Sequence, residues 1–441
     1  MFSKIKSLFT VADLRNKVLF TLFIFAVYRI GVSLRAPGVD AQAISQLREA
    51  SESQGALGFL NLFSGGAFGS FSIFALGVMP YITASIIMQV LTVVIPKLEQ
   101  WQQEGATGQR KITQWTRYVA VAIATLQAAG LTFIFGQGNG SAFFGAAATV
   151  PDVVLLDPFM PRALLVIPSL VAGTVMIMWL GELISQRGIG NGMSMMIFAS
   201  IVSDLPYGYY SLLQSRKTFV FVVLVGVTLL ILAAVVRVEL GQRRIPVQFA
   251  KRVVGRRQFG GQSTYIPIKV NMAGVVPVIF ASSLLYLPAL IAQFNQPDAQ
   301  GQVAPWVTWV STYLTQGDHP LYMALYFLLI LGFTYFYVAI TFNPEEVSDN
   351  MKQYGGFIPG IRAGRPTTEF LEYVLSRITF PGAIYLGLIA LIPLVAFSLI
   401  GANQNFPFGG TSILIIVGVG LDTVKQINAQ MQQRNYEGLL K

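Results

Sequence analysis

Ten long apolar runs alternate with polar segments along the chain, and most are close to the length of about 20 residues that a helix needs to cross a bilayer. The fifth and tenth runs are shorter than the others. The predicted spans are 18–34, 76–95, 118–135, 163–180, 192–205, 219–236, 272–291, 321–342, 378–400 and 411–425. The pattern therefore predicts an all-α membrane protein with ten transmembrane helices.

A nine-residue motif occurs twice, as GVMPYITAS at 77–85 and as GVVPVIFAS at 274–282, with six identical positions. The copies open the second and the seventh predicted span, which are equivalent places in two sets of five. Gly and Pro breaks at corresponding places in two halves are typical of internal repeats around a transport site. Because five is odd, the second set starts on the opposite side of the membrane. We therefore expect two inverted halves, 1–205 and 206–441.

The stretch just before the second span interrupts the pattern. Residues 59–74 are rich in Gly and Phe, carry no charge and are too broken for an ordinary span. Irregular backbone at membrane depth has to line a cavity or pack against protein. The stretch predicts a re-entrant segment that dips into the membrane and turns. Taken alone, it is equally consistent with an apolar outer loop between two plain helices.

Composition and charge agree with a membrane protein of defined orientation. Hydrophobic residues are 54% and charged residues 11% of the chain, and mean hydropathy is +0.61. The absence of cysteine excludes disulfides and thiolate metal sites, and a single histidine is too few for a histidine-based metal site or proton relay. With the N-terminus placed in the cytoplasm, 24 of the 30 Lys and Arg residues lie in inner segments and five in outer ones. This asymmetry predicts that both termini are cytoplasmic.

Two of the predicted inner segments, 237–271 and 343–377, are longer than connectors need to be. The first holds eight cations against one acid, Glu239. Orientation alone explains most basic loops, but this density favours a docking surface for an anionic partner. Alternation of apolar and polar residues at 245–249 indicates a short hairpin. Because most cations follow the topology, the net charge of +10 does not indicate a DNA partner.

Two other classes of function fit the residues less well. A small-solute secondary transporter with inverted repeats normally keeps an ionisable residue near the middle of the bilayer, whereas the one charge deep in a predicted span is Arg29, towards its outer end. An intramembrane enzyme would need a motif such as HExxH or GxSxG, and the chain has neither. The phosphate-binding loop of nucleotide hydrolases is also missing. Energy for transport must therefore come from a partner.

Six motifs, in this order, resemble the SecY family of protein-conducting channels over essentially the whole chain. They are FALGVMPYITASIIMQ (74–89), GIGNGMS (188–194), GQRR (241–244), YIPIKVNMAGVVPVIFASS (265–283), GFIPGIRAG (356–364) and GGTSILI (409–415). The chain differs at Ala363, where the family often has proline. The resemblance implies an hourglass pore in the bacterial inner membrane. This pore would pass unfolded polypeptides of the general secretory pathway and release hydrophobic segments into lipid through a lateral gate. It implies no enzyme activity, cofactor or metal.

The resemblance also assigns roles to particular residues. The pore ring would be Ile82, Ile86, Ile197, Ile279 and Ile415. The plug, at about 59–74, would include Leu62, Phe63, Gly65, Gly66, Phe68, Gly69 and Phe71. The lateral gate would include Thr92, Gln127 and Asn271, and the contact with a motor or ribosome would include Arg243, Arg244, Arg256, Arg257 and Arg362. The implied partners are SecE, SecG, the SecA ATPase motor, the ribosome, unfolded preproteins with their signal sequences, and membrane lipids.

The residue types fit these roles, although each also has a simpler interpretation. Ile82 and Ile86 are four residues apart, so both can face the same side of a helix. A narrow apolar constriction dewets and blocks ions, whereas an isoleucine in a span usually packs against a helix or faces lipid. The plug glycines keep the segment pliable, and its phenylalanines supply apolar contact without charge.

Overall fold

The structure is a computed structural model that describes residues 12–40, 63–135, 159–215, 218–249, 252–254, 257–259, 263–293, 304–315, 319–400 and 410–437. Each predicted span falls on a long helix within these ranges. The helices are α2 (Ala12–Ser33), α5 (Met79–Val94), α7 (Ala106–Ile134), α9 (Phe159–Arg187), α10 (Gly192–Ser215), α11 (Thr218–Glu239), α12 (Val276–Gln293), α14 (Pro320–Thr341), α16 (Arg365–Ile400) and α17 (Gly410–Glu437). The predicted helical membrane architecture is confirmed. Judged by length and composition alone, five of the described helices could cross a membrane, or six if the bent pair α5 and α6 counts as one span.

Several helices extend well beyond the apolar runs that predicted them. α16 begins at Arg365 rather than near 378, and α17 continues to Glu437 rather than ending near 425. The fifth span is also longer than its apolar run, because α10 continues to Ser215 through Pro206. Once a helix has nucleated, polar residues extend it at little cost where water is available. Hydropathy therefore located the spans but underestimated the length of the helices.

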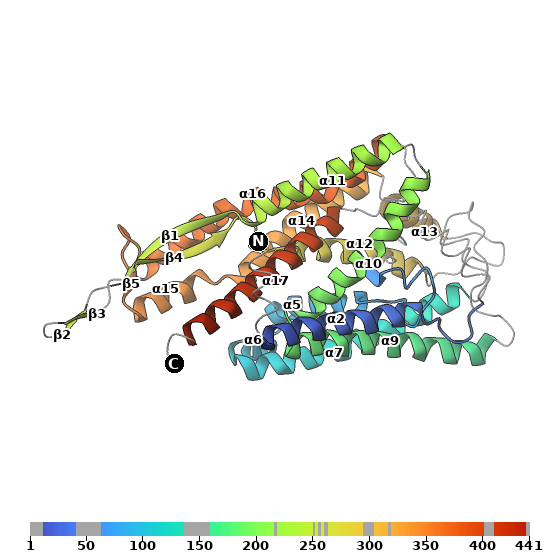
Figure 1. The fold of residues 1–441 in the computed structure, drawn as a ribbon, viewed down its shortest axis with the longest axis horizontal. Helices are drawn as coiled ribbons and strands as arrows, with labels where there is room; N and C mark the ends of the chain where they lie inside the picture. The colour runs from blue at the N-terminus through green and yellow to red at the C-terminus, as the bar shows by residue number, and fades with distance from the viewer. Residues whose placement is uncertain are drawn as a thin grey trace.

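Figure 1 shows the helices lying broadly along the long axis of the molecule. At one end lie the strands β1 (Gln242–Phe249) and β4 (Ser263–Lys269), the short helix α15 (Pro344–Gln353) and the C-terminal part of α17. The short helix α13 (Pro305–Val310), which carries Trp306 and Trp309, lies towards the other end and is followed by a π-helical turn at Ser311–Thr315.

The two copies of the repeated motif start helices at the same register and run in opposite directions. α5 begins at Met79 and α12 at Val276, which are equivalent positions of the motif. The preceding glycines, Gly77 and Gly274, have φ angles of +57° and +61°, a conformation that glycine adopts without strain. α5 leads through a bend of 100° into α6 (Pro96–Gln103), which lies towards the β1–β4 end, whereas α12 leaves that end after β4 and leads to α13. The repeat in the sequence is thus also a repeat in the structure.

The basic segment between α11 and α12 forms most of a small antiparallel sheet of order β4-β1-β5. β5 (Gly356–Phe357) comes from the next inner segment and pairs with Gln248 and Phe249 of β1. A second pair, β2 (Arg252–Val254) and β3 (Arg257–Phe259), extends the tip of the hairpin. The sequence indicated the hairpin at 245–249 but gave no sign that both long inner segments share one sheet.

The base of this hairpin is fixed to the bundle. Val270 donates its backbone N–H to the carbonyl of Gly241 at 3.0 Å, which closes the hairpin where it meets the helices. The carbonyl of Val270 in turn lies against Gly382 of α16, where a Cβ atom would come within 2.4 Å of the oxygen. Ile245, Val247 and other apolar residues of the sheet pack with Leu371 of α16 in one buried cluster.

The described core is organised as clusters that pack the helices together. One cluster joins α2, α5, α7, α9 and α10 with the segment that precedes α5, and a second joins α11, α12, α14, α16 and α17. The first also receives Ile279 from α12 and Ile415 from α17, so it spans both sets of helices. The boundary between the halves at 205/206 stays a prediction.

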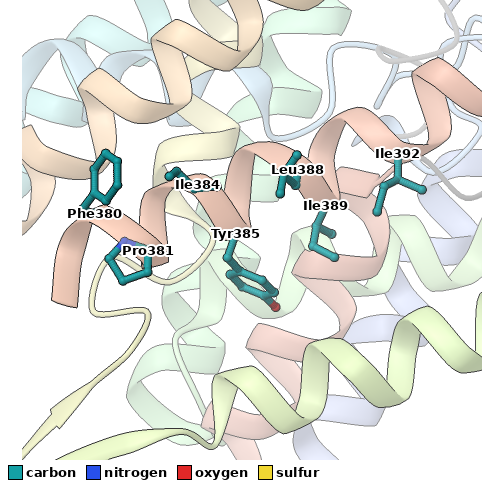
Figure 2. Close-up of a pocket in the computed structure, with 7 residues that line it drawn as sticks. All are labelled: Phe380, Pro381, Ile384, Tyr385, Leu388, Ile389 and Ile392. Atoms are coloured by element: carbon teal, nitrogen blue, oxygen red, sulfur yellow. The ribbon is translucent and has the colours of Figure 1, made fainter. Parts of the chain in front are cut away.

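An outward face of α16 forms an open apolar groove (Figure 2). It is lined by Phe380, Pro381, Ile384, Tyr385, Leu388, Ile389 and Ile392. The Tyr385 hydroxyl is buried and has no hydrogen-bond partner in the described part of the chain. The remaining lining is what a membrane helix presents to lipid or to another helix.

Candidate pore, plug and gate

The five isoleucines of the predicted ring come together in the structure. Ile82, Ile197, Ile279 and Ile415 are buried in one apolar cluster, and the partly buried Ile86 packs against it. Ile82 and Ile279, which occupy the same position in the two copies of the motif, are each 7% exposed. They come from helices α5 and α12, which contact each other. The cluster therefore stands where the two sets of helices meet.

The described part of the predicted plug packs into the same cluster. Phe63, Phe68, Phe71 and Phe74 are buried there beside the isoleucines, and Gly69 is buried as well. Leu62 and the rest of 59–62 lie outside the described residues. From residue 65 onward the segment is a succession of turns rather than a helix.

The turns of this segment need backbone angles that few residues adopt. Gly65 and Gly66 have φ angles of +64° and +85°, and Phe71 is at +43°. A non-glycine residue with positive φ is strained and persists only where its surroundings hold it in place. Here Ala36 donates its N–H to the Phe71 carbonyl at 3.0 Å. The segment is therefore held by the residues around it.

Hydrogen bonds satisfy much of this irregular backbone inside the protein. Ile73 donates to the carbonyl of Leu34 at 2.9 Å, and the Ser70 hydroxyl lies 3.1 Å from the carbonyls of both Gly66 and Ala67. Arg35 and Ser72 form an isolated antiparallel bridge. The prediction that the stretch turns at membrane depth requires such internal satisfaction.

Glycines on neighbouring helices let the segment approach closely. A Cβ atom at Gly173 of α9 would lie 2.0 Å from the carbonyl oxygen of Ile73, and one at Gly31 of α2 would overlap the ring of Phe74 at the same distance. Real Cβ atoms are not found so close to other heavy atoms. The position of this segment therefore depends on glycine at these two sites.

Residues of α2 and α10 that the sequence left without a role also contact the segment. Tyr28 donates its hydroxyl hydrogen bond to the carbonyl of Ser64, and Arg29 donates to the carbonyl of Gly65. Ser200 and Ser203 of α10 lie within hydrogen-bond distance of these two side chains. Only the charge of Arg29 within a span pointed to this site.

The three predicted gate residues are all buried but are not joined to one another. Thr92 lies on α5, Gln127 on α7 and Asn271 just before α12, which contacts both of those helices. Thr92 donates its hydroxyl to the carbonyl of Gln89 on its own helix at 2.7 Å. Within the described residues, no hydrogen bond links the three side chains.

Asn271 instead ties the end of α11 to the start of α12. Its Nδ2 donates to Glu239 Oε1 at 2.6 Å and to the carbonyl of Gly274 at 3.0 Å, while its Oδ1 is buried without a partner in the described chain. Glu239 lies beyond the predicted span 219–236. Burial raises the pKa of its carboxyl group, and the Asn271 hydrogen bond and the charge of Lys269 oppose that shift.

Two of the five basic residues predicted to meet a partner lie on strand β1 of the sheet that projects from the bundle. Arg243 and Arg244 are exposed neighbours on β1, so their side chains leave opposite faces of the strand. The Arg244 guanidinium stacks over the ring of Tyr265 at 4.8 Å. Arg362 is exposed in the turn that precedes α16. Arg256 lies outside the described residues, as does the side chain of Arg257.

Comparison with known proteins decides the family. The sequence profile of the SecY family matches residues 72–424. The chain belongs to the SecY family. Curated SecY relatives include the protein translocase subunit SecY of Streptomyces galbus, 56% identical over 98% of both chains, and that of Micrococcus luteus, 54% identical over the full length of both. SecY of Mycobacterium bovis is 52% identical over 99% of both chains.

Solved structures share the SecY fold. One, described as a protein-conducting channel, matches with a TM-score of 0.62 and 19% identity over 95% of this chain and 92% of its own. Another, Sec61 in the canine ribosome–channel complex from the endoplasmic reticulum, matches with a TM-score of 0.59 and 19% identity over the same shares. SecY membership makes this chain a translocase subunit in a membrane and not an enzyme, and it decides against the small-solute transporter.

Proposed function

We propose that this chain forms the pore through which unfolded polypeptides of the general secretory pathway cross the bacterial inner membrane. The observation that supports this most directly is the buried cluster of isoleucines contributed by α5, α10, α12 and α17, with the plug phenylalanines packed into it. Such a cluster stands between the two inverted halves, where repeat transporters and channels place their pathway.

An isoleucine ring suits a pathway that must accept any sequence. A polypeptide of arbitrary composition cannot be bound through complementary hydrogen bonds, and an aliphatic ring offers none. The same ring excludes ions because a narrow apolar constriction dewets. In this proposal Ile82 and Ile279, at equivalent positions of the repeat, line the pathway from opposite sides, and Ile86, Ile197 and Ile415, which belong to or pack against the same cluster, complete the ring.

A lateral exit for hydrophobic segments is proposed at the seam where α12 meets α5 and α7. The residues proposed to act there are Thr92, Gln127 and Asn271, all of which are buried. In the part of the chain that the structure describes, no hydrogen bond joins these three side chains across the seam, and a polar contact in a membrane contributes only about 1 kcal/mol, so we expect the seam to open for a signal sequence at little cost. Release into lipid follows from that opening.

The proposed partners are inferred from the exposed cations and from membership of the SecY family. The projecting sheet with Arg243, Arg244 and Arg362 is the proposed docking surface for the SecA ATPase motor and the ribosome, which supply the energy that this chain lacks. SecE and SecG are the proposed membrane partners. Both termini are proposed to be cytoplasmic, on the same side as the sheet, as the distribution of Lys and Arg predicts.

Cross-linking tests the central proposal. The chain has no native cysteine, so Ile82→Cys and Ile279→Cys can each be introduced alone. A secretory polypeptide stalled in transit and carrying one cysteine is expected to form a disulfide with either position.

The matched control is Ile392→Cys, on the outward groove of α16 (Figure 2). Little cross-linking is expected there. Efficient cross-linking at Ile392 with none at Ile82 or Ile279 would show that the isoleucine cluster is not the pathway.

The gate is tested by Asn271→Leu. Loss of the amide leaves Glu239 buried without its hydrogen-bond donor, and an uncompensated buried group is costly. We expect export to change most for weakly hydrophobic signal sequences, whose gain on entering lipid is smallest. Export is measured for signals of graded hydrophobicity. Glu239→Gln, which keeps an oxygen to accept from Asn271, is expected to stay near wild type. An unchanged ranking of signals in Asn271→Leu would remove this residue from the gate.

A further inference from the structure

Tyr28 holds both ends of the described plug, residues 63–74. Its hydroxyl lies 2.7 Å from the carbonyl oxygen of Ser64, to which it donates, and 2.7 Å from Ser200 Oγ on α10. The face of its ring stacks on Phe74, with ring centroids 5.7 Å apart and planes within 10° of parallel. Tyr28 is 1% exposed. One side chain of α2 thus binds the beginning of the plug by its polar tip and the end by its apolar face.

Arg29, the next residue, contacts the adjacent plug carbonyl. Its Nη1 donates to the oxygen of Gly65 at 3.1 Å and lies 3.4 Å from Ser203 Oγ. A charge within a membrane span is costly and marks a functional site with a partner. The partners of Arg29 in the structure are a plug carbonyl and a hydroxyl of α10, so its position in the span is explained by the plug.

Backbone geometry shows why these carbonyls need outside donors. Gly65 is in a turn with φ of +64°, and a Cβ atom there would lie 3.0 Å from Tyr28 Oη and 3.1 Å from the backbone of Ser200. The plug backbone therefore runs directly against α2 and α10. A buried carbonyl without a donor costs free energy because it has given up its hydrogen bonds to water.

We propose that Tyr28 and Arg29 of α2 form a latch that keeps the plug seated through hydrogen bonds to its main-chain carbonyls, with Ser200 and Ser203 of α10 holding the two latch side chains in place. The inference rests on the proposed plug and adds the residues that position it. Because the latch binds backbone and not side chains, it constrains the shape of the plug more than its sequence.

The latch shares a helix with the ring. Ile197 and Ser200 are three residues apart on α10, which places them on neighbouring parts of one helix face, and Ser203 continues the row with its hydroxyl bonded to the Ser200 carbonyl at 2.9 Å. A polypeptide that displaces Ile197 on entering the ring also moves the two serines. Opening of the pore and release of the plug are thereby coupled through α10.

Thiol labelling of the reconstituted translocase tests the latch. Ala67 lies in the plug and is fully buried, so Ala67→Cys reacts with a membrane-impermeant maleimide only when the plug leaves its seat. Tyr28→Phe keeps the ring stacked on Phe74 and removes the hydroxyl. It is expected to speed labelling about tenfold, which corresponds to about 1.4 kcal/mol. Arg29→Gln is expected to shift the rate in the same direction.

The matched control is Tyr385→Phe, which removes a hydroxyl that has no hydrogen-bond partner among the described residues. It is expected to leave the labelling rate of Ala67→Cys unchanged. Equal rates in Tyr28→Phe and Tyr385→Phe would overturn the latch. If Tyr28→Phe does not assemble, Ser200→Ala takes its place, with faster labelling expected and an unchanged rate counting against the latch. The labelling rate reports directly whether the segment is in its buried position, whereas its role in sealing the pore is tested separately by ion conductance.

Discussion

Deleting residues 62–71 is expected to raise the ion conductance of idle channels about ten- to hundredfold, on the basis that a displaced plug is a minor state of about 1–10% occupancy in the intact protein. The phenylalanines of this segment are buried in the same apolar cluster as the isoleucines, and their loss is expected to leave the ring alone to exclude ions. Polypeptide export should persist because the ring and the seam are intact. Conductance is measured in planar bilayers at fixed channel density.

A second variant separates loss of the plug from shortening of the chain. Replacing 62–71 by an equally long Gly–Ser segment removes the buried rings of Phe63, Phe68 and Phe71 while the connection keeps its length. The same leak is expected. Conductance at the wild-type level in both variants would mean that the segment does not seal the idle pore, even if the latch residues still hold it.

Reversing Arg243 and Arg244 to Glu is expected to weaken binding of the motor ATPase about ten- to hundredfold at low salt. Both side chains are exposed on the projecting strand β1. Exposed charges act through a solvent that screens them, so binding to the unaltered chain should fall as salt rises. Affinity is measured over a range of salt concentrations with the purified partner.

The control for this pair places the same charge change elsewhere on the predicted inner side. Lys97, in the first turn of α6, and Arg110, near the start of α7, are both exposed. Their reversal to Glu should have a much smaller effect on the affinity for the motor. Equal losses in both variants would indicate net charge rather than a docking surface. Salt-independent binding would remove the electrostatic basis of the prediction.

Apolar run length and the glycine–proline repeat were enough to predict the spans and their inversion. The repeat was the stronger signal, because Gly77 and Gly274 share an unusual backbone angle and start their helices at the same register. Helix ends were not predictable from hydropathy, since α16 and α17 continue through polar residues that remain helical in water. The hydropathy pattern predicts which residues lie in lipid, and not how far the hydrogen-bonded helix continues beyond them.

Contacts between distant segments were the part that sequence could not supply. β5 has only two residues, too few for any period, and it becomes a strand because β1 offers it a free edge. Tyr28 and Ser200 are ordinary residues in apolar helices, 172 positions apart. The partner of Asn271 was likewise hidden, because Glu239 looked like the lone acid of a basic loop rather than a buried acceptor.

The anchoring of the projecting sheet has a mechanical consequence. At the base of the sheet, the Val270 carbonyl packs against Gly382 of α16. Asn271 hydrogen-bonds to Glu239 at the end of α11 and to the Gly274 carbonyl just before α12. The sheet is therefore fixed at its base to α11, α12 and α16. If a partner docks on the sheet as proposed, a force that it applies there acts on these three helices together and not on one alone.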